Sequence, residues 1–218
     1  MESLLTRIRR EASERDPFLI AIDGRCGAGK STLAAELAAA LDANLIHIDD
    51  FFLRPEQRTE TRLATPGENI DHERFFTEVL CHLRTGEAFA YRPFSCATQT
   101  LGPPVTVTPK PVTIVEGSYS CHPALRDQYD LRLFVTVDPE EQMRRLRERD
   151  GGYAEVFRQK WIPLEEAYFA KCGVETCCHQ TLSVAQKKFT NSPLKLSPKT
   201  NNSICVCLLN NKKKTKNY

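Results

Sequence analysis

The residues best able to do chemistry lie in one glycine-rich stretch near the N-terminus, which has the spacing G-x-x-x-x-G-K-S. Glycines at this spacing allow the backbone to curl, so that successive N–H groups point at phosphate oxygens. The Lys30 ammonium would reach the β- and γ-phosphates of a nucleotide, and the Ser31 hydroxyl would bind Mg²⁺. The predicted phosphate-binding residues are Gly24, Gly27, Ala28, Gly29, Lys30, Ser31 and Thr32.

The segments on either side of this stretch are those that the motif requires. Residues 18–22 are a short apolar run suited to a buried strand, and residues 33–41 are rich in alanine and leucine, which favour a helix. The N-terminus of that helix would add partial positive charge at the phosphate site. A strand, a loop and a helix in this order predict nucleotide binding.

Acidic residues end two further predicted strands. Residues 44–48 lead into Asp49 and Asp50, and residues 112–116 end in Glu116. Because the carboxyl ends of parallel strands face the ligand crevice, we expect these carboxylates near the γ-phosphate. Asp49 could accept the proton of an attacking hydroxyl, although either aspartate could instead cap the next segment or bind Mg²⁺ through water. Glu116 is predicted to help hold Mg²⁺.

A phosphate-binding loop does not by itself name a reaction. A GTPase would carry an Asn-Lys-x-Asp motif, but the Asn-Lys pair at Asn211 leads into lysines. An AAA-type or transporter ATPase would have a strand ending in Asp-Glu, whereas residues 112–116 end in one acid followed by Gly117. Both classes are disfavoured, while a nucleotide-dependent switch ATPase without a phosphoryl acceptor stays open.

Four motifs together resemble those of uridine kinase. Besides the glycine-rich loop, they are Asp49-Asp-Phe-Phe, Glu68-Asn-Ile-Asp71-His72 and Glu116-Gly-Ser-Tyr, and the resemblance runs from about Phe18 to Cys172. The wider group includes phosphoribulokinase and pantothenate kinase. The resemblance implies an α/β, three-layer P-loop NTPase fold with a mostly parallel five-stranded sheet, a small β-hairpin insertion and a helical lid. It also implies an ATP-dependent kinase that uses Mg²⁺ and phosphorylates a hydroxyl group of a small molecule.

The same resemblance assigns roles to single residues. Asp49 matches the acid that deprotonates the acceptor hydroxyl, and Asp71, with His72 beside it, matches the residue that holds the ribose hydroxyls. Asp71 also has the position of an N-cap for the helical pattern that follows. Tyr91 falls where the family places an aromatic ring against the base, but it could equally pack the hairpin expected between residues 88 and 110.

An arginine-rich helix follows the strand predicted at residues 131–137. Phosphoryl transfer needs positive charge over the γ-phosphate, and a mobile lid can bring it. Arg149 resembles a lid arginine of the family, Arg145 is a second candidate, and the glycines at residues 151–152 could act as a hinge. The alternative is an ordinary solvated basic face.

The charges divide the chain into two parts. All acidic residues lie at or before Glu175, whereas residues 187–218 carry eight lysines and no acid. We predict a kinase domain at residues 1–180, with the hairpin at 88–110 and the lid at 144–152. Residues 181–218 form a Lys- and Asn-rich extension, expected to be poorly ordered after a weak edge strand.

The predicted catalytic residues are Asp49, Lys30 and Arg149. A nucleoside is the expected acceptor, with pantothenate, a sugar or another riboside as alternatives on the same machinery. No nucleic-acid or membrane partner is expected, because the tail alone carries the excess of lysine and no apolar stretch approaches the ~20 residues of a membrane-spanning helix. Nine cysteines without a secretory signal favour a cytoplasmic protein. The sequence leaves the oligomeric state open.

Overall fold

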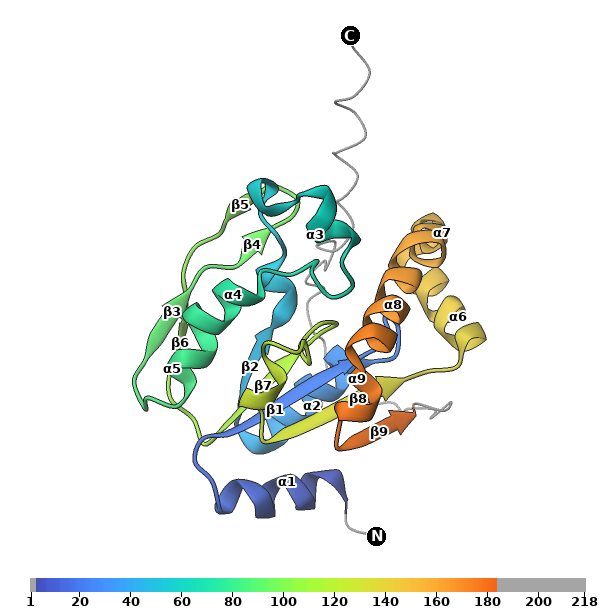
Figure 1. Ribbon diagram of the computed structural model, residues 1–218. Coiled ribbons are helices and arrows are strands. Elements are labelled where there is room, and N and C mark those ends of the chain that lie inside the picture. The colour runs from blue at the N-terminus through green and yellow to red at the C-terminus, as the bar shows by residue number, and fades with distance from the viewer. Residues whose placement is uncertain (1–2, 184–218) are drawn as a thin grey trace.

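A five-stranded parallel sheet forms the centre of the molecule, in the order β2-β7-β1-β8-β9 (Figure 1). The computed structural model describes residues 3–183, so most of the predicted extension lies outside the described residues. The strands are β1 (Phe18–Gly24), β2 (Asn44–His47), β7 (Val112–Glu116), β8 (Leu131–Thr136) and β9 (Gln180–Ser183). β1 is central and buried on both faces, which explains its unbroken apolar sequence.

Side chains alternate between two cores on opposite faces of the sheet. Leu19 and Ala21 pack on one side, and Ile20 and Ile22 pack on the other. Helices α1 (Leu4–Ser13) and α2 (Lys30–Leu41) cover the face of Ile20. The opposite face is covered by α4 (His72–Phe75), α5 (Cys81–Leu83), α8 (Ile162–Cys172) and α9 (Val174–Cys177). The three-layer α/β fold with a five-stranded sheet, predicted from the sequence, is confirmed.

Two long helices each contain one wider turn. The first joins α4 to α5 through a π-turn, η3 (Phe76–Leu80). The second joins α7 (Ala154–Val156) to α8 through another π-turn, η6 (Phe157–Trp161). Such turns are rare and often mark functional sites.

The remaining helices are short, apart from the arginine-rich helix. α6 (Pro139–Asp150) is capped by Asp138, whose side chain accepts the N–H groups of Glu140 and Glu141 in the first turn. The short elements are η1 (Ile48–Phe51), η2 (Pro55–Gln57), α3 (Glu60–Ala64), η4 (Arg126–Gln128) and η5 (Gly151–Tyr153).

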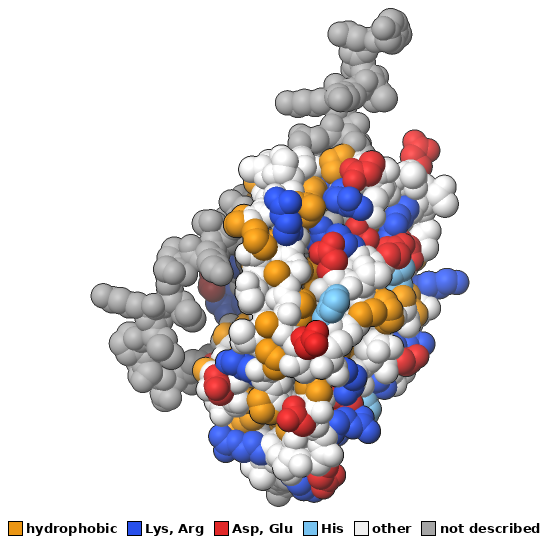
Figure 2. Space-filling view, turned by 90° about the vertical axis from the view of Figure 1, so that its left-hand side faces the viewer, with side chains coloured by type: hydrophobic (Ala, Val, Ile, Leu, Met, Phe, Trp, Pro, Cys, Tyr) orange, Lys and Arg blue, Asp and Glu red, His pale blue; other side chains and the backbone are white. Residues whose placement is uncertain are grey.

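The predicted insertion is a nested hairpin. Its outer pair is β3 (Phe89–Tyr91) with β6 (Val105–Val107), and its inner pair is β4 (Phe94–Ser95) with β5 (Thr100–Leu101). It stands beside α4 and α5 at the left of the molecule (Figure 1). On this side, basic and acidic side chains are interspersed with small apolar spots (Figure 2).

The last described strand, β9, lies at the sheet edge and pairs with β8. It contains Gln180 and Ser183, so it crosses the position at which the domain boundary was predicted. Within residues 3–183, no helix combines the length and the apolar character needed to cross a membrane.

Candidate active site

The glycine-rich loop leaves the end of β1 and returns as the first turn of α2. Gly24 has φ +135°, and a Cβ atom there would lie 2.0 Å from the carbonyl oxygen of Val135, so only glycine fits. Gly27 (φ +72°) and Gly29 (φ +95°) also occupy the left-handed region that glycine tolerates. Ala28 is fully buried against the sheet, and Thr32 is exposed on the first turn of α2. The loop therefore curls in front of the helix N-terminus, as the motif predicts.

Lys30 is held inside this loop. Its Nζ donates to the carbonyl oxygens of Gly24 (2.7 Å) and Arg25 (3.0 Å) and approaches the Ser118 hydroxyl at 3.3 Å. The side chain is buried. The ammonium group is thus already at the loop where phosphate oxygens would replace the carbonyl oxygens as its partners.

The two residues predicted to hold Mg²⁺ lie together. The Ser31 hydroxyl donates to the Glu116 carboxylate at 3.2 Å, and Glu116 also lies 2.6 Å from Nδ1 of His47. The contact with Glu116 raises the pKa of His47. Hydroxyl and carboxylate oxygens are the hard ligands that Mg²⁺ prefers, so this pair fits that ion.

Asp49 lies directly after β2, on η1. Burial and the negative charge of Glu116 raise the pKa of Asp49 to about 7. A carboxylate with a pKa near 7 is well suited to accept the proton of a hydroxyl group at neutral pH. The neighbouring Asp50 is occupied differently, because its carboxylate accepts the Tyr91 hydroxyl and its backbone carbonyl accepts Arg74.

A cavity opens beside Asp49. Its lining residues come from the end of β2, the segment around α3, the turn after β7 and the α7–α8 helix. They are Asp49, Phe52, Leu53, Arg58, Leu63, Asn69, Ser118, Tyr119, Phe157, Trp161 and Glu165. Because it adjoins both Asp49 and residues that contact the glycine-rich loop, this cavity is the candidate acceptor site.

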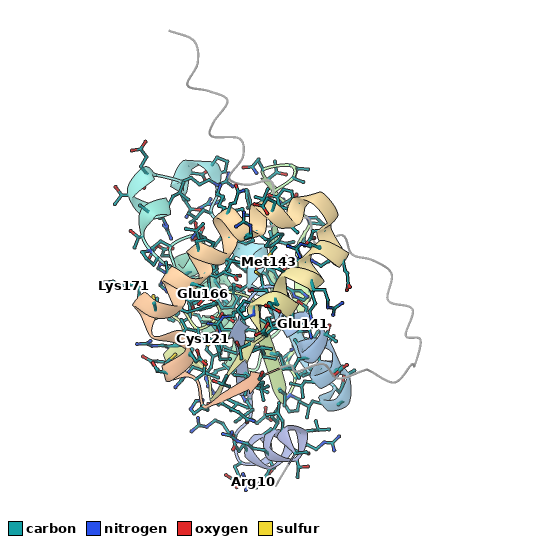
Figure 3. The ribbon with its side chains drawn as sticks, turned by 90° about the vertical axis from the view of Figure 1, so that its right-hand side faces the viewer. Arg10, Cys121, Glu141, Met143, Glu166 and Lys171 are labelled. Atoms are coloured by element: carbon teal, nitrogen blue, oxygen red, sulfur yellow. The ribbon has the colours of Figure 1, made fainter. Side chains whose placement is uncertain are left out.

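Two adjacent glutamates of α8, which sequence reasoning missed, hold the loop from the side. The Glu165 carboxylate accepts the Cys26 backbone N–H at 3.0 Å and the Ser118 hydroxyl at 2.5 Å. Glu166, labelled in Figure 3, forms a bidentate pair with Arg25 at 2.7 and 3.0 Å. The only sign of this role in the sequence is an acid within a predicted helix, and in the structure Glu165 is buried. No spacing rule connects a helix residue with a loop about 140 residues earlier in the chain.

Two predicted substrate residues are engaged inside the protein. Asp71 is the N-cap of α4, with its Oδ1 accepting the Arg74 N–H at 3.1 Å, and only 2% of it is exposed. The Tyr91 ring packs at 5.2 Å from that of Phe51, and its hydroxyl donates to Asp50. Neither residue lines the cavity beside Asp49. Besides a substrate role, the sequence allowed Asp71 to be an N-cap and Tyr91 to pack the hairpin. The structure shows the N-cap bond of Asp71 and the packing of the Tyr91 ring.

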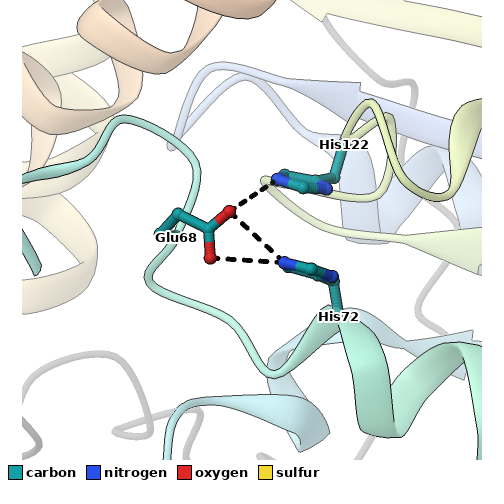
Figure 4. Close-up of side chains that lie close together, drawn as sticks. All are labelled: Glu68, His72 and His122. Carbon is teal, nitrogen blue, oxygen red and sulfur yellow. Dashed lines mark hydrogen bonds and ion pairs between the residues drawn. The ribbon is translucent and has the colours of Figure 1, made fainter. Parts of the chain in front are cut away.

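His72 belongs to a three-residue cluster with Glu68 and His122. The two imidazole rings are stacked 4.3 Å apart, and their Nε2 atoms lie 3.2 Å (His72) and 3.6 Å (His122) from Glu68 (Figure 4). The Nδ1 atom of His122 accepts the Ala124 N–H, so its proton is on Nε2 and faces the carboxylate. His72 is within hydrogen-bond distance of Glu68, whereas His122 makes a longer contact with it, and the three ligand atoms lie close enough together that this group could hold a metal ion.

The lid arginines differ in their contacts. Arg149 pairs with Asp150 at 2.8 Å, lies over the Phe157 ring and is more than half exposed. Arg145 pairs with Glu141 and approaches the Gly27 carbonyl oxygen at 3.3 Å. In the described structure Arg145 is therefore the arginine of α6 that contacts the glycine-rich loop, while Arg149 lies next to the glycine pair after α6.

The sequence is similar to proteins named as uridine-cytidine kinases. It is 27% identical over 188 residues to a "Probable uridine-cytidine kinase" from Caenorhabditis elegans, which covers 78% of this chain and 75% of the relative. It is 28% identical over 149 residues to uridine-cytidine kinase B from Dictyostelium discoideum, covering 62% of this chain and 59% of the relative. No protein-family model matches the sequence.

Solved structures share the fold. A provisionally assigned fructose transport system kinase from Silicibacter sp. TM1040 superposes with a TM-score of 0.65 at 24% identity, covering 84% of this chain and 100% of that one. A "Possible Uridine Kinase" from Bacillus stearothermophilus superposes with a TM-score of 0.57 at 17% identity, covering 81% and 97%. The sequence relatives and the shared fold confirm the resemblance on which the motifs were interpreted.

Proposed function

We propose that this chain, which resembles the uridine kinase-like P-loop kinases in sequence and fold, is an ATP-dependent kinase that phosphorylates a hydroxyl group of a nucleoside. The observation that carries the proposal is the position of Asp49. It lies at the end of β2, next to the Ser31–Glu116 pair, and lines a cavity. Phosphoryl transfer to an alcohol requires a base at the acceptor, a metal-binding pair and a phosphate loop, and Asp49 lines the cavity beside the other two.

The residues of the loop would hold the nucleotide. Lys30 and the backbone N–H groups of residues 24–32 would bind the phosphates, and Ser31 with Glu116 would bind Mg²⁺. When bound, MgATP supplies the phosphoryl group. Asp49 orients the acceptor hydroxyl and takes its proton as the new oxygen–phosphorus bond forms, and ADP leaves with the electrons of the broken bond. Positioning and charge do most of the catalysis in such sites.

The lid would complete the site. We propose that Arg149 turns from Asp150 toward the transferring phosphoryl group when the helix pair α6 and α7 closes. Its guanidinium would then offset negative charge that develops in the transition state. The glycines at residues 151–152 lie at the junction of these helices and supply the needed freedom. Arg145 would assist from its present place at Gly27.

The identity of the acceptor is tested directly. The purified full chain is incubated with MgATP and with uridine, cytidine, adenosine, ribose, fructose or pantothenate, and ADP and phosphorylated product are both measured. A nucleoside 5′-phosphate formed in equal amount with ADP supports the proposal. ATP hydrolysis without any phosphorylated acceptor would identify a switch ATPase.

The cytoplasmic location predicted from the sequence belongs to this proposal and is tested by fractionation.

A further inference from the structure

The cavity beside Asp49 has two chemically different ends. At one end are Asp49, Ser118 and Glu165, the last two of which contact Lys30 and Cys26 of the phosphate loop. The rest of the lining is mainly apolar and aromatic. The apolar and aromatic side chains are Phe52, Leu53, Leu63, Phe157 and Trp161, and Arg58, Asn69 and Tyr119 complete the lining. A ligand in this cavity would place a reactive group at the loop and an apolar or planar part against this wall.

Two buried polar atoms belong to the lining residues and have no hydrogen-bond partner. They are Oδ1 of Asn69, an acceptor, and Nε1 of Trp161, a donor. The residues are only 7% and 6% exposed. Buried polar groups are nearly always paired, so an unpaired acceptor and an unpaired donor in the lining of one cavity could pair with a ligand that enters it. Trp161 also ends the π-turn η6, a type of distortion that recurs at functional sites.

We infer that Asn69 and Trp161 select the acceptor by binding its heterocyclic base. This inference rests on the proposed kinase function, because Asp49 fixes which end of the cavity holds the reacting hydroxyl. Oδ1 of Asn69 accepts a ring N–H or amino group, and Nε1 of Trp161 donates to a ring carbonyl or nitrogen. The ring packs against the apolar wall.

This assignment differs from the one that the sequence motifs gave to Tyr91. The Tyr91 hydroxyl is bonded to Asp50, and its ring is buried against Phe51. The proposed base-binding role of Asn69 and Trp161 also predicts that a free sugar binds poorly. A sugar carries a hydroxyl on almost every carbon, and most of these would face the apolar wall without a partner.

The chain offers a direct test, because Trp161 is its single tryptophan. Tryptophan fluorescence, excited at wavelengths that the six tyrosines do not absorb, therefore reports the surroundings of Trp161. Uridine, cytidine, ribose, fructose and pantothenate are titrated without ATP. We expect a saturable fluorescence change with a nucleoside and none with the two sugars or pantothenate. No fluorescence change and no calorimetric heat with any nucleoside, with or without MgATP, would overturn the inference.

Two variants locate the contacts. Trp161→Phe keeps an aromatic ring but removes the donor, and Asn69→Leu keeps the approximate shape but removes the acceptor. Each is expected to weaken nucleoside binding about tenfold in calorimetry, the effect of one buried neutral hydrogen bond, and to raise the KM of the nucleoside more than it lowers kcat. The KM of ATP stays unchanged. Lys171→Ala, on the exposed end of α8, is the matched control and should bind as the wild type does. Wild-type binding by both variants would also overturn the inference.

The inference and the proposed function fail in different ways. Nucleoside binding that perturbs Trp161, without any phosphorylated product, would leave the base-binding cavity in place and reject the kinase. Phosphorylation of an acceptor that lacks a heterocycle, at equal rates in the wild type and in Trp161→Phe, would keep the kinase and reject the base-binding role.

Discussion

The carboxylate of Glu165 accepts the backbone N–H of Cys26 at 3.0 Å, so helix α8 holds the phosphate-binding loop from a distance of 139 residues along the chain. The same carboxylate accepts the Ser118 hydroxyl, which in turn contacts Lys30. The helix that carries Trp161 and Phe157 at its wide turn is therefore fixed to the loop that would bind ATP. This contact connects the candidate acceptor cavity to the proposed nucleotide site.

Replacing Glu165 with alanine should weaken both the fold and ATP binding. Two buried hydrogen bonds to a carboxylate are lost, each worth about 1.5–3 kcal/mol, and the Cys26 N–H is left without its partner. Glu165→Gln can still accept from Cys26 and donate to Ser118, so it should recover most of the loss. Urea unfolding and ATP titration of the two variants measure this difference. Equal behaviour of alanine and glutamine would show that the carboxylate does not hold the loop.

Replacing Asp49 with asparagine should lower kcat by about 10²–10⁴-fold and leave ATP affinity nearly unchanged. In the wild type the base is active when ionised, and the pKa of Asp49 is raised to about 7. The rate should therefore rise with pH up to about 7 and level off above it. Initial rates between pH 5 and 9 test this, and Asp49→Asn should lack the rise. A wild-type profile that is flat across pH 7 would contradict the role of Asp49 as the base.

Replacing Gly24 with alanine should prevent the loop from closing. The added Cβ would lie 2.0 Å from the Val135 carbonyl oxygen, and a backbone atom cannot move aside as a side chain can. Gly86 is the control, since it also has positive φ but has nothing within 4 Å of the added atom. Gly86→Ala should lose only about 1–2 kcal/mol of unfolding free energy from the left-handed backbone. Thermal unfolding and ATP binding of the two variants should separate the two effects. Gly24→Ala has the steric clash in addition to the backbone strain, whereas Gly86→Ala has the strain alone.

The two lid arginines should respond differently to removal. Arg149→Ala is expected to lower kcat by about 10²-fold with little effect on stability, because the Arg149–Asp150 pair is exposed and such pairs contribute little. Arg145→Ala should mainly raise the KM of ATP, because Arg145 contacts the phosphate loop at Gly27. Steady-state kinetics on both variants distinguishes the role of Arg149 in catalysis from the role of Arg145 in ATP binding. A larger fall in kcat for Arg145→Ala would assign the transition-state contact to that residue.

The His122 imidazole should make the fold sensitive to acid. Its burial and the neighbouring His72 lower the pKa of His122 to about 4, below the usual 6.5. The unfolded chain therefore binds the proton first, and the stabilisation present above pH 6.5 is lost as the pH falls toward 4. Between pH 6.5 and 5 the wild type should lose about 2 kcal/mol more unfolding free energy than His122→Phe, which cannot titrate. Parallel urea curves at the two pH values measure this difference, and equal losses would contradict it.

Local pattern was enough to predict much of the site. The loop at residues 24–32, Asp49 and Glu116 each lie at or just after the carboxyl end of a strand, and in a parallel sheet these ends share one edge. Asp71 and Tyr91 show the limit of this reasoning. Both carry the expected residue type, and in the structure Oδ1 of Asp71 accepts an N-cap bond while the Tyr91 hydroxyl donates to Asp50. Oδ2 of Asp71 has no hydrogen-bond partner among the described residues, and the substrate role of each residue stays a prediction.

The sequence by itself determined the fold class, the phosphate loop and the order of the acidic residues, because short-range periodicity and glycine spacing encode strands, helices and tight turns. Only the tertiary structure decided which distant side chains meet. Trp161 and Asn69 line one cavity, and Glu165 reaches Cys26, through packing between elements far apart in the sequence. Such contacts depend on how the helices pack on the sheet, and the spacing of residues within one segment carries no information about this packing.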